Sequence, residues 1–181
     1  MVHNMKVYPK KKLIIGIDEV GRGSLAGPVC SVAVSLGQIG KIGLTQDLYL
    51  SLKDSKLLSK KKRLQIFEEI TKQGIIYAIG WASVVEIERL NILQASLLSM
   101  YRAYESYISK LNINVPNILI KIDGIHTPKG IRSKSKNCNV EIEMIKNGDS
   151  LIKEISAASI IAKVIRDLYM QEISKFYPNY N

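Results

Sequence analysis

A short apolar segment closed by two acidic residues constrains this chain most. Leu13 to Ile17 is apolar, and Asp18 and Glu19 follow it directly. The segment is far too short to cross a membrane, and it suits a strand buried in a covered sheet. Charged residues are not expected to close a buried strand by chance. We therefore predict an interior strand whose end carries a functional pair of carboxylates.

The two members of this pair need a special arrangement to share one site. Adjacent strand residues point to opposite faces of a sheet. We expect the strand to end at Asp18-Glu19, so that Glu19 curls back toward Asp18. Gly21 and Gly23 follow closely, and they make the bend feasible because glycine adopts backbone conformations that other residues avoid.

Four further segments are typical of strands, and four are typical of helices. The strands are expected at 29–36, 75–81, 118–122 and 140–144. Helices are expected after the caps Ser59, Ser83 and Asn91, and from about Ser156 to Lys175. In the first helix, Leu64, Phe67 and Ile70 form an apolar stripe that predicts a buried face. No repeat or linker divides residues 1–181, so we predict one α/β domain with a mixed five-stranded sheet flanked by helices.

The composition favours an anionic partner and a location in the cytoplasm. The net charge of +10 points to nucleic acid. A coding bias toward lysine, isoleucine and asparagine would raise the charge as well. No signal sequence or membrane-spanning segment is recognisable, so we expect a cytoplasmic location. We also expect a monomer. Cys30 and Cys138 have no pairing pattern, and two histidines give no zinc-ligand spacing, so both thiols are expected to be free.

Two further acids are placed where they could join the first pair. Asp123 follows the fourth predicted strand, and Asp149 follows the fifth. Phosphodiester cleavage by two metal ions needs several carboxylates, because hard cations take oxygen ligands and their charge must be balanced. Asp18, Glu19, Asp123 and Asp149, called the four acids below, are therefore candidate metal ligands and catalytic residues. For Asp149 a turn or a helix cap is the alternative, since Gly-Asp-Ser is common in turns.

A glycine-rich loop and several basic residues are candidates for contact with a nucleic acid. Gly21-Arg22-Gly23 could present backbone N–H groups and a guanidinium to a phosphate or a ribose. No Gly-Lys-Ser/Thr motif follows, so the loop does not indicate hydrolysis of a nucleoside triphosphate. The basic residues that could contact a nucleic-acid backbone are Lys53, Lys56, the run 60–63, Lys129, Arg132, Lys134 and Lys136. A solvated face is the alternative for the basic runs.

The order of short motifs along the chain resembles that of the bacterial ribonuclease HII family. The first block is Ile17-Asp18-Glu19-Val20-Gly21-Arg22-Gly23 with Ala26-Gly27-Pro28, and the last is Ile155-Ser156-Ala157-Ala158-Ser159-Ile160-Ile161-Ala162-Lys163-Val164 followed by Arg166-Asp167. Between them lie Asp54-Ser55-Lys56 with Leu58-Ser59, Glu86-Ile87 with Leu90-Asn91-Ile92, Ile122-Asp123-Gly124 and Gly148-Asp149-Ser150. The motifs span residues 13 to about 180, and the two end blocks are highly specific.

This resemblance implies a ribonuclease H-like fold and an endonuclease that hydrolyses the RNA strand of RNA–DNA hybrids. It also implies cleavage on the 5′ side of single ribonucleotides in a DNA duplex, with 5′-phosphomonoester products. The four acids would bind Mn²⁺ or Mg²⁺, which activates a water and stabilises the departing 3′ oxygen. The Gly21–Gly23 loop would recognise the ribose 2′-hydroxyl. Asp167 is expected to be structural, paired with Lys163 or Arg166.

The chain departs from the family in two places. Residues 132–139 are a lysine- and serine-rich insertion, which is expected to form an exposed loop. Family members continue beyond the Tyr-Pro-x-Tyr motif at 177–180 into a segment whose tyrosine stacks at the ribonucleotide junction, and this sequence stops at Asn181. A catalytically impaired protein that only binds hybrids is the resulting alternative. Another nuclease or a strand transferase of the same fold is disfavoured by the Gly-Arg-Gly loop.

Overall fold

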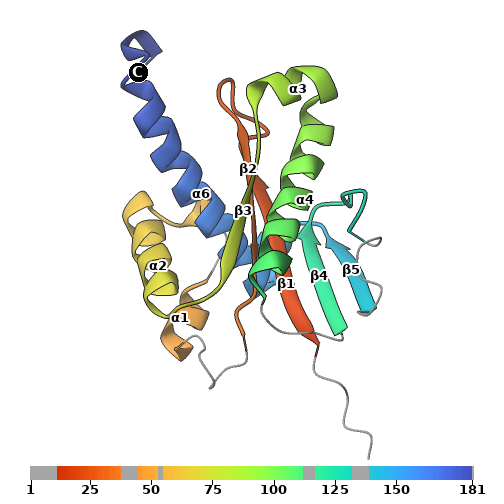
Figure 1. The fold of residues 1–181 in the computed structure, drawn as a ribbon. Coiled ribbons are helices and arrows are strands. Elements are labelled where there is room, and N and C mark those ends of the chain that lie inside the picture. The colour runs from red at the N-terminus through yellow and green to blue at the C-terminus, as the bar shows by residue number, and fades with distance from the viewer. Residues whose placement is uncertain (1–11, 38–44, 53–54, 112–116, 132–138, 181) are drawn as a thin grey trace, which may run out of the picture.

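A mixed five-stranded sheet forms the centre of the protein. The computed structural model describes residues 12–37, 45–52, 55–111, 117–131 and 139–180. The strands are β1 (Leu13–Val20), β2 (Val29–Val34), β3 (Tyr77–Ala82), β4 (Asn117–Asp123) and β5 (Asn139–Ile145). They lie in the order β3-β2-β1-β4-β5 (Figure 1). β1 and β3 run antiparallel to β2, whereas β4 runs parallel to β1 and β5. The five predicted strands and the α/β fold class are confirmed.

Helices cover both faces of this sheet. They are α1 (Gln46–Ser51), α2 (Lys60–Lys72), α3 (Val84–Leu90), α4 (Ile92–Lys110), α5 (Gly148–Leu151) and α6 (Lys153–Ser174), with the 3-10 turns η1 (Ser55–Leu57) and η2 (Pro178–Tyr180). α4 packs on β1, β2 and β3 from one face, and α6 packs on β1 and β2 from the other, beside α2 (Figure 1). Within the described ranges, no helix combines the length and the apolar character that a membrane span requires.

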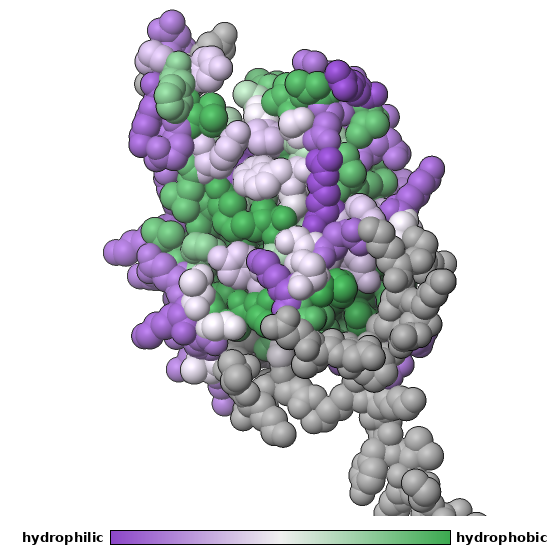
Figure 2. All heavy atoms as spheres, viewed as in Figure 1, coloured by the Kyte–Doolittle hydropathy of each residue, from purple (hydrophilic) through white to green (hydrophobic). Residues whose placement is uncertain are grey.

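Close contacts between helices and strands fix the two layers. A Cβ atom added to Gly16 of β1 would lie 2.2 Å from the backbone carbonyl carbon of Glu154 in α6. One added to Gly80 of β3 would lie 2.1 Å from the carbonyl oxygen of Ser99 in α4. Each helix therefore rests directly on the sheet backbone, and an apolar cluster fills the remaining space on each face. On the face of the molecule that carries the edge strand β3, hydrophobic residues are exposed in the middle and hydrophilic residues lie on both sides of them (Figure 2).

The register of the sheet brings the ends of β1 and β4 together. The pairing of these parallel strands places Asp18 of β1 level with Asp123 of β4. β1 does not end at the acidic pair as predicted. It continues to Val20, because Asp18 and Glu19 both pair with residues of β2. The prediction that the first strand ends at Asp18-Glu19 is therefore wrong, although the strand itself is where the sequence placed it.

The predicted helices are present with altered details. α6 begins at Lys153 rather than at Ser156. On α2 the fully buried residues are Ile66 and Ile70, whereas Leu64 is 38% exposed, so the predicted apolar stripe is wrong at Leu64. The helices α1 and α5 were not predicted, because six and four residues are too few for an apolar repeat to show.

An ion pair between α3 and α4 should make stability depend on pH. Arg102 donates to both carboxylate oxygens of Glu86, at 2.7 and 2.9 Å, and also to the carbonyl of Trp81. Hydrogen bonds from Arg102 and from the Ser83 backbone lower the pKa of Glu86 to about 2. A depressed carboxylate pKa stabilises the fold fully above the ordinary value near 4.5, and that contribution is lost as the pH falls toward 2.

We therefore expect Glu86→Gln to lower the free energy of unfolding by about 1 kcal/mol at pH 6, because the pair is partly solvated. The difference between variant and wild type should shrink at pH 3. Urea unfolding at the two pH values measures this, and an equal difference at both would contradict the assignment.

Candidate metal centre

The four acids line one pocket at the ends of β1 and β4. The pocket has a volume of about 250 Å³. Its lining residues are Asp18, Glu19, Val20, Ser55, Lys56, Arg63, Asp123, Asp149, Ser159 and Lys163. They come from β1, β4, η1, α2, α5 and α6, so segments far apart in the sequence build it together. The structure thus brings together all four acids that the sequence singled out.

Asp18 and Asp123 line this pocket from the neighbouring strands β1 and β4. Asp18 is only 5% exposed and accepts a hydrogen bond from the backbone N–H of Glu19 at 2.7 Å, and the nearby Ser159 hydroxyl favours its charged form by lowering its pKa. Asp123 accepts a 2.6 Å hydrogen bond from the backbone N–H of Gly148. These bonds orient each carboxylate and leave other oxygen lone pairs for a ligand.

Glu19 reaches the same pocket although its neighbour Asp18 points to the other face of β1. Because β4 ends at Asp123, no strand flanks β1 beside Glu19 on that side, and the longer side chain can turn around the open flank. Its Oε1 atom accepts a 3.1 Å hydrogen bond from Arg22. Its Oε2 atom is buried and has no hydrogen-bond partner among the described residues. A buried carboxylate oxygen without a partner is costly, so this atom is suited to a cation.

Asp149 enters the pocket from α5, the single helical turn between β5 and α6. Asn147 precedes it in a left-handed conformation with φ of 56°, and this turn reverses the chain. The Asp149 side chain is buried, and Lys56 lies 3.3 Å from its Oδ2 atom. The helix cap position belongs to Asn147, so the alternative in which Asp149 caps a helix is not what the structure contains.

Burial and mutual repulsion make negative charge unfavourable in this pocket. Burial raises the pKa of Asp18 well above its ordinary value, and the charges of Glu19 and Asp123 raise it further. Burial likewise raises the pKa of Glu19, and it raises the pKa of Asp123 with help from Asp149. A divalent cation would remove this penalty, and carboxylate oxygens are the ligands that hard cations prefer. The residues present therefore fit such an ion.

The four acids are not arranged to coordinate one metal ion together in this structure. Among the described residues, no three side chains of His, Cys, Asp or Glu lie close enough together to coordinate one ion as they stand. Asp149 is held by Lys56 and Glu19 by Arg22. Arg22 contacts only the Oε1 atom of Glu19, so the Oε2 atom can bind an ion while this pair stays in place.

Basic residues predicted to contact nucleic acid are found in three settings. Lys56 and Arg63 line the acid pocket, and Arg22 lies beside it in the loop after β1. Lys129 lines a different hollow, together with residues of α4. Four other basic residues named from the sequence lie outside the described residues, and so does Cys138; the four are Lys53, Arg132, Lys134 and Lys136. Cys30 is a buried free thiol, as predicted.

Two serines of the pocket were not recognised as site residues from the sequence. These are Ser55 and Ser159, whose hydroxyls lie 2.8 Å apart, and Ser159 lowers the pKa of Asp18. The sequence did contain a signal for Ser159, because it lies among small and apolar residues of α6. A buried hydroxyl there needs a hydrogen-bond partner. Asp167 pairs with Lys163 at 2.7 Å and with Arg63 at 4.0 Å, in keeping with the structural role expected for it.

Comparison with known proteins identifies relatives along almost the whole chain. The family model described as Ribonuclease HII matches residues 15–180. Ribonuclease HII of Nitrosomonas europaea is 43% identical over 169 residues, which are 93% of this chain and 69% of the relative. Ribonuclease HII of Psychromonas ingrahamii is 41% identical over 174 residues, 96% of this chain and 75% of the relative.

Solved structures share the fold. A PCNA:RNase HII complex from Archaeoglobus fulgidus matches with a TM-score of 0.65 and 22% identity, over 91% of this chain and 77% of the solved chain. Bst-RNase HIII in complex with Mn²⁺ matches with a TM-score of 0.69 and 20% identity, over 91% of this chain and 55% of the solved chain. The fold is thus ribonuclease H-like, and the match of the family model together with the two curated relatives shows that this chain belongs to the ribonuclease HII family.

Proposed function

We propose that the four acids hold the divalent metal ions with which this member of the ribonuclease HII family cleaves its substrate. The observation that carries the proposal is their convergence in one pocket, where the pKa values of Asp18, Glu19 and Asp123 are all raised. The unpartnered Oε2 atom of Glu19 supports it, because a cation would supply the missing partner.

As a member of this family, the chain is a metal-dependent endoribonuclease that cleaves RNA in RNA–DNA hybrids and at ribonucleotides in DNA. When bound, divalent ions lower the pKa of water and offset the charge of the reacting phosphate. The protein's own part is to orient the ligands. The backbone N–H groups of Glu19 and Gly148 orient Asp18 and Asp123, while Asp149 lines the same pocket from the helical turn that follows Asn147. Mn²⁺ and Mg²⁺ both suit an all-oxygen ligand set, so we propose either ion.

The substrate contacts belong to the same proposal. Gly21, Arg22 and Gly23 lie immediately beyond the acid pocket, and Arg22 and Gly23 are exposed. Their exposure supports a role for this loop in recognising the ribose 2′-hydroxyl, because backbone groups near the scissile phosphate could reach it. Lys56 is proposed to contact the phosphate backbone, together with Lys53 outside the described residues. A monomeric state, a cytoplasmic location and a single domain stay predictions from the sequence.

A comparison of duplexes tests the proposed function. The protein is incubated with Mn²⁺ or Mg²⁺ and a DNA duplex that holds one ribonucleotide, beside a matched duplex without it. We expect a cut on the 5′ side of the ribonucleotide, no cut in the all-DNA duplex, and loss of cleavage when a chelator removes the metal. Tight hybrid binding by folded protein without cleavage would instead favour the impaired alternative, which no feature of the described residues supports.

Lys56 gives a smaller and separable effect. Its side chain is 80% exposed although it pairs with Asp149, so it can also reach a phosphate. We expect Lys56→Gln to weaken binding to all duplexes by several-fold and to reduce the slope of log Kd against log salt by about 1. Lys72→Gln, at the far end of α2, is the matched control and should leave the slope unchanged. An unchanged slope in Lys56→Gln would remove Lys56 from the interface.

A further inference from the structure

A buried arginine of α6 contacts the glycine-rich loop from inside the protein. Arg166 is 6% exposed, and its side chain points at the segment between β1 and β2. Its Nε atom donates to the carbonyl of Pro28 at 2.9 Å, and its Nη2 atom donates to the carbonyl of Ala26 at 2.8 Å. The sequence predicted that Asp167 pairs with Lys163 or Arg166. In the structure Asp167 pairs with Lys163 and Arg63 instead of Arg166.

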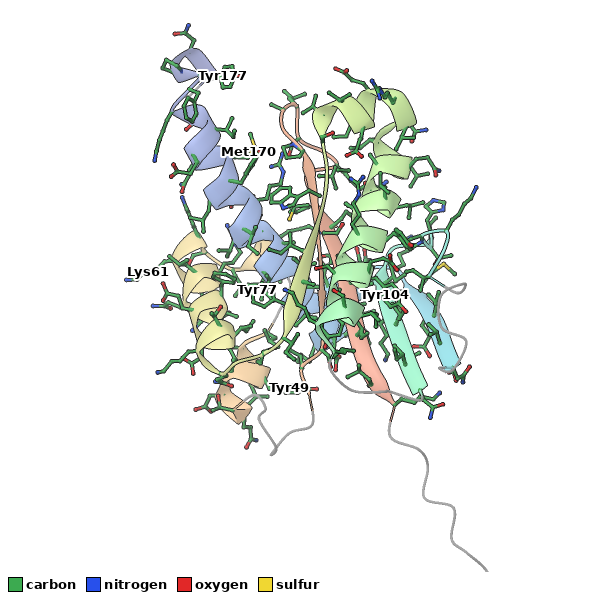
Figure 3. All side chains as sticks on the ribbon, in the orientation of Figure 1. Tyr49, Lys61, Tyr77, Tyr104, Met170 and Tyr177 are labelled. Atoms are coloured by element: carbon green, nitrogen blue, oxygen red, sulfur yellow. The ribbon has the colours of Figure 1, made fainter. Side chains whose placement is uncertain are left out.

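The same guanidinium also packs against the other limb of the loop. A Cβ atom added to Gly21 would lie 2.6 Å from Nε of Arg166, and one added to Gly27 would lie 2.5 Å from the sulfur of Met170, one helical turn further along α6. Gly21 and Gly27 have positive φ values of 108° and 85°, which favour glycine. Figure 3 shows Met170 on α6 beside this loop. The two ends of the loop, at Gly21 and Gly27, therefore pack against Arg166 and Met170 of α6.

The tip of the loop, by contrast, is open to solvent. Residues 22–26 are exposed, and Leu25 projects fully into solvent. A 3.2 Å hydrogen bond from Ser24 to the carbonyl of Gly21 closes the turn. A short exposed turn of this kind keeps a single conformation only when its base is fixed. Burying a guanidinium is costly unless its donors are satisfied, and here backbone carbonyls of the loop accept two of its hydrogen bonds.

We propose that Arg166 is a positioning residue that clamps the base of the Gly21–Gly23 loop, so that the loop meets the ribonucleotide in one conformation. The proposal rests on the proposed role of this loop in substrate recognition. Arg166 itself does not line the acid pocket. Its loss should therefore alter the discrimination between ribonucleotide and deoxyribonucleotide, and it should leave metal binding by the four acids intact.

Hydrogen exchange tests the clamp without any substrate. Arg166→Met keeps much of the side-chain volume but removes both donors, and Arg166→Lys keeps one donor. We expect the amide of Ser24, which donates to the Gly21 carbonyl, to exchange at least about tenfold faster in Arg166→Met, the change that goes with about 1.4 kcal/mol, and to quicken less in Arg166→Lys. Arg102→Met, which removes a hydrogen-bonded arginine elsewhere, is the matched control and should leave this segment unchanged. Unchanged loop exchange in both Arg166 variants would overturn the clamp.

Binding then tests the consequence for recognition. In a background of Asp123→Asn, which is expected to block cleavage, Kd is measured for a duplex with one ribonucleotide and for the all-DNA duplex. Arg166→Met should reduce the preference for the ribonucleotide about tenfold, with partial recovery in Arg166→Lys and none of this loss in Arg102→Met. Faster loop exchange with an intact preference would overturn the positioning role. If the Asp123→Asn parent itself shows no preference, the proposed recognition by the loop fails, and the exchange result alone decides whether the clamp exists.

Discussion

Replacing Asp18 with asparagine is expected to reduce cleavage of a single-ribonucleotide duplex by roughly a thousandfold or more, the equivalent of about 4 kcal/mol in the barrier. Asp18 is only 5% exposed, and Asp123 lies on the neighbouring strand in the same pocket. Asparagine keeps the shape and one oxygen, but it removes the charge that would bind a cation.

The same substitution should stabilise the metal-free protein. The raised pKa of Asp18 means that the folded protein holds its proton more tightly than the unfolded chain does. Stability from this group is therefore largest at low pH and is lost as the pH rises through the folded pKa. Asparagine carries no charge at pH 7, so the variant does not have this pH-dependent loss of stability. Its melting temperature without metal should therefore exceed that of the wild type at pH 7. Added Mn²⁺ should stabilise the wild type and have little effect on the variant.

Calorimetric melting and cleavage assays on the same preparations separate these effects. Asp47→Asn, on the exposed side of α1, is the matched control and should change neither cleavage nor the response to Mn²⁺. An Asp18→Asn protein that is less stable than the wild type without metal would mean that the carboxylate supports the fold rather than a cation.

Replacing Gly16 with alanine is expected to lower the free energy of unfolding by about 3 kcal/mol. The new methyl group would lie 2.2 Å from the backbone carbon and 2.4 Å from the backbone oxygen of Glu154. Backbone atoms cannot rotate away as a side chain can, so α6 would have to move off the sheet. Because Ser159 and Lys163 of α6 line the acid pocket, cleavage should fall together with stability.

Gly23→Ala is the matched control for stability. No atom lies within 4 Å of a Cβ at this position, so its free energy of unfolding should stay within about 0.5 kcal/mol of the wild type. Urea denaturation of the two variants measures the contrast. A Gly16→Ala protein as stable as Gly23→Ala would show that α6 does not rest on β1 as closely as the structure has it.

Much of the fold could be predicted because its local patterns are strong. The five strands and the four longer helices follow from apolar runs and caps such as Ser83, whose hydroxyl and Glu86 partner are present in the structure. The strand order could not be predicted, since pairing between β1 and β4 depends on contacts more than a hundred residues apart. The exposure of Leu64 was missed for a similar reason, because the position of α6 decides which side of α2 is buried.

The candidate site was predicted residue by residue, but its geometry was not. The sequence identified the acid at each chain position and attributed the meeting of Asp18 and Glu19 to the end of a strand. In the structure it is the neighbouring strand that ends, at Asp123, and this leaves room for Glu19. The clamp by Arg166 had no sequence signal, because a guanidinium that bonds backbone carbonyls leaves no pattern in the partner residues.

Titration with Mn²⁺, followed by calorimetry, tests the central claim most directly. The proteins compared are the wild type, Asp18→Asn, Glu19→Gln, Asp123→Asn and Asp149→Asn, with Asp47→Asn as control. We predict that the wild type and the control bind Mn²⁺ alike and that each change among the four acids weakens binding at least about tenfold. Mn²⁺ binding of equal strength in all six proteins would contradict the assignment of the four acids as the metal centre.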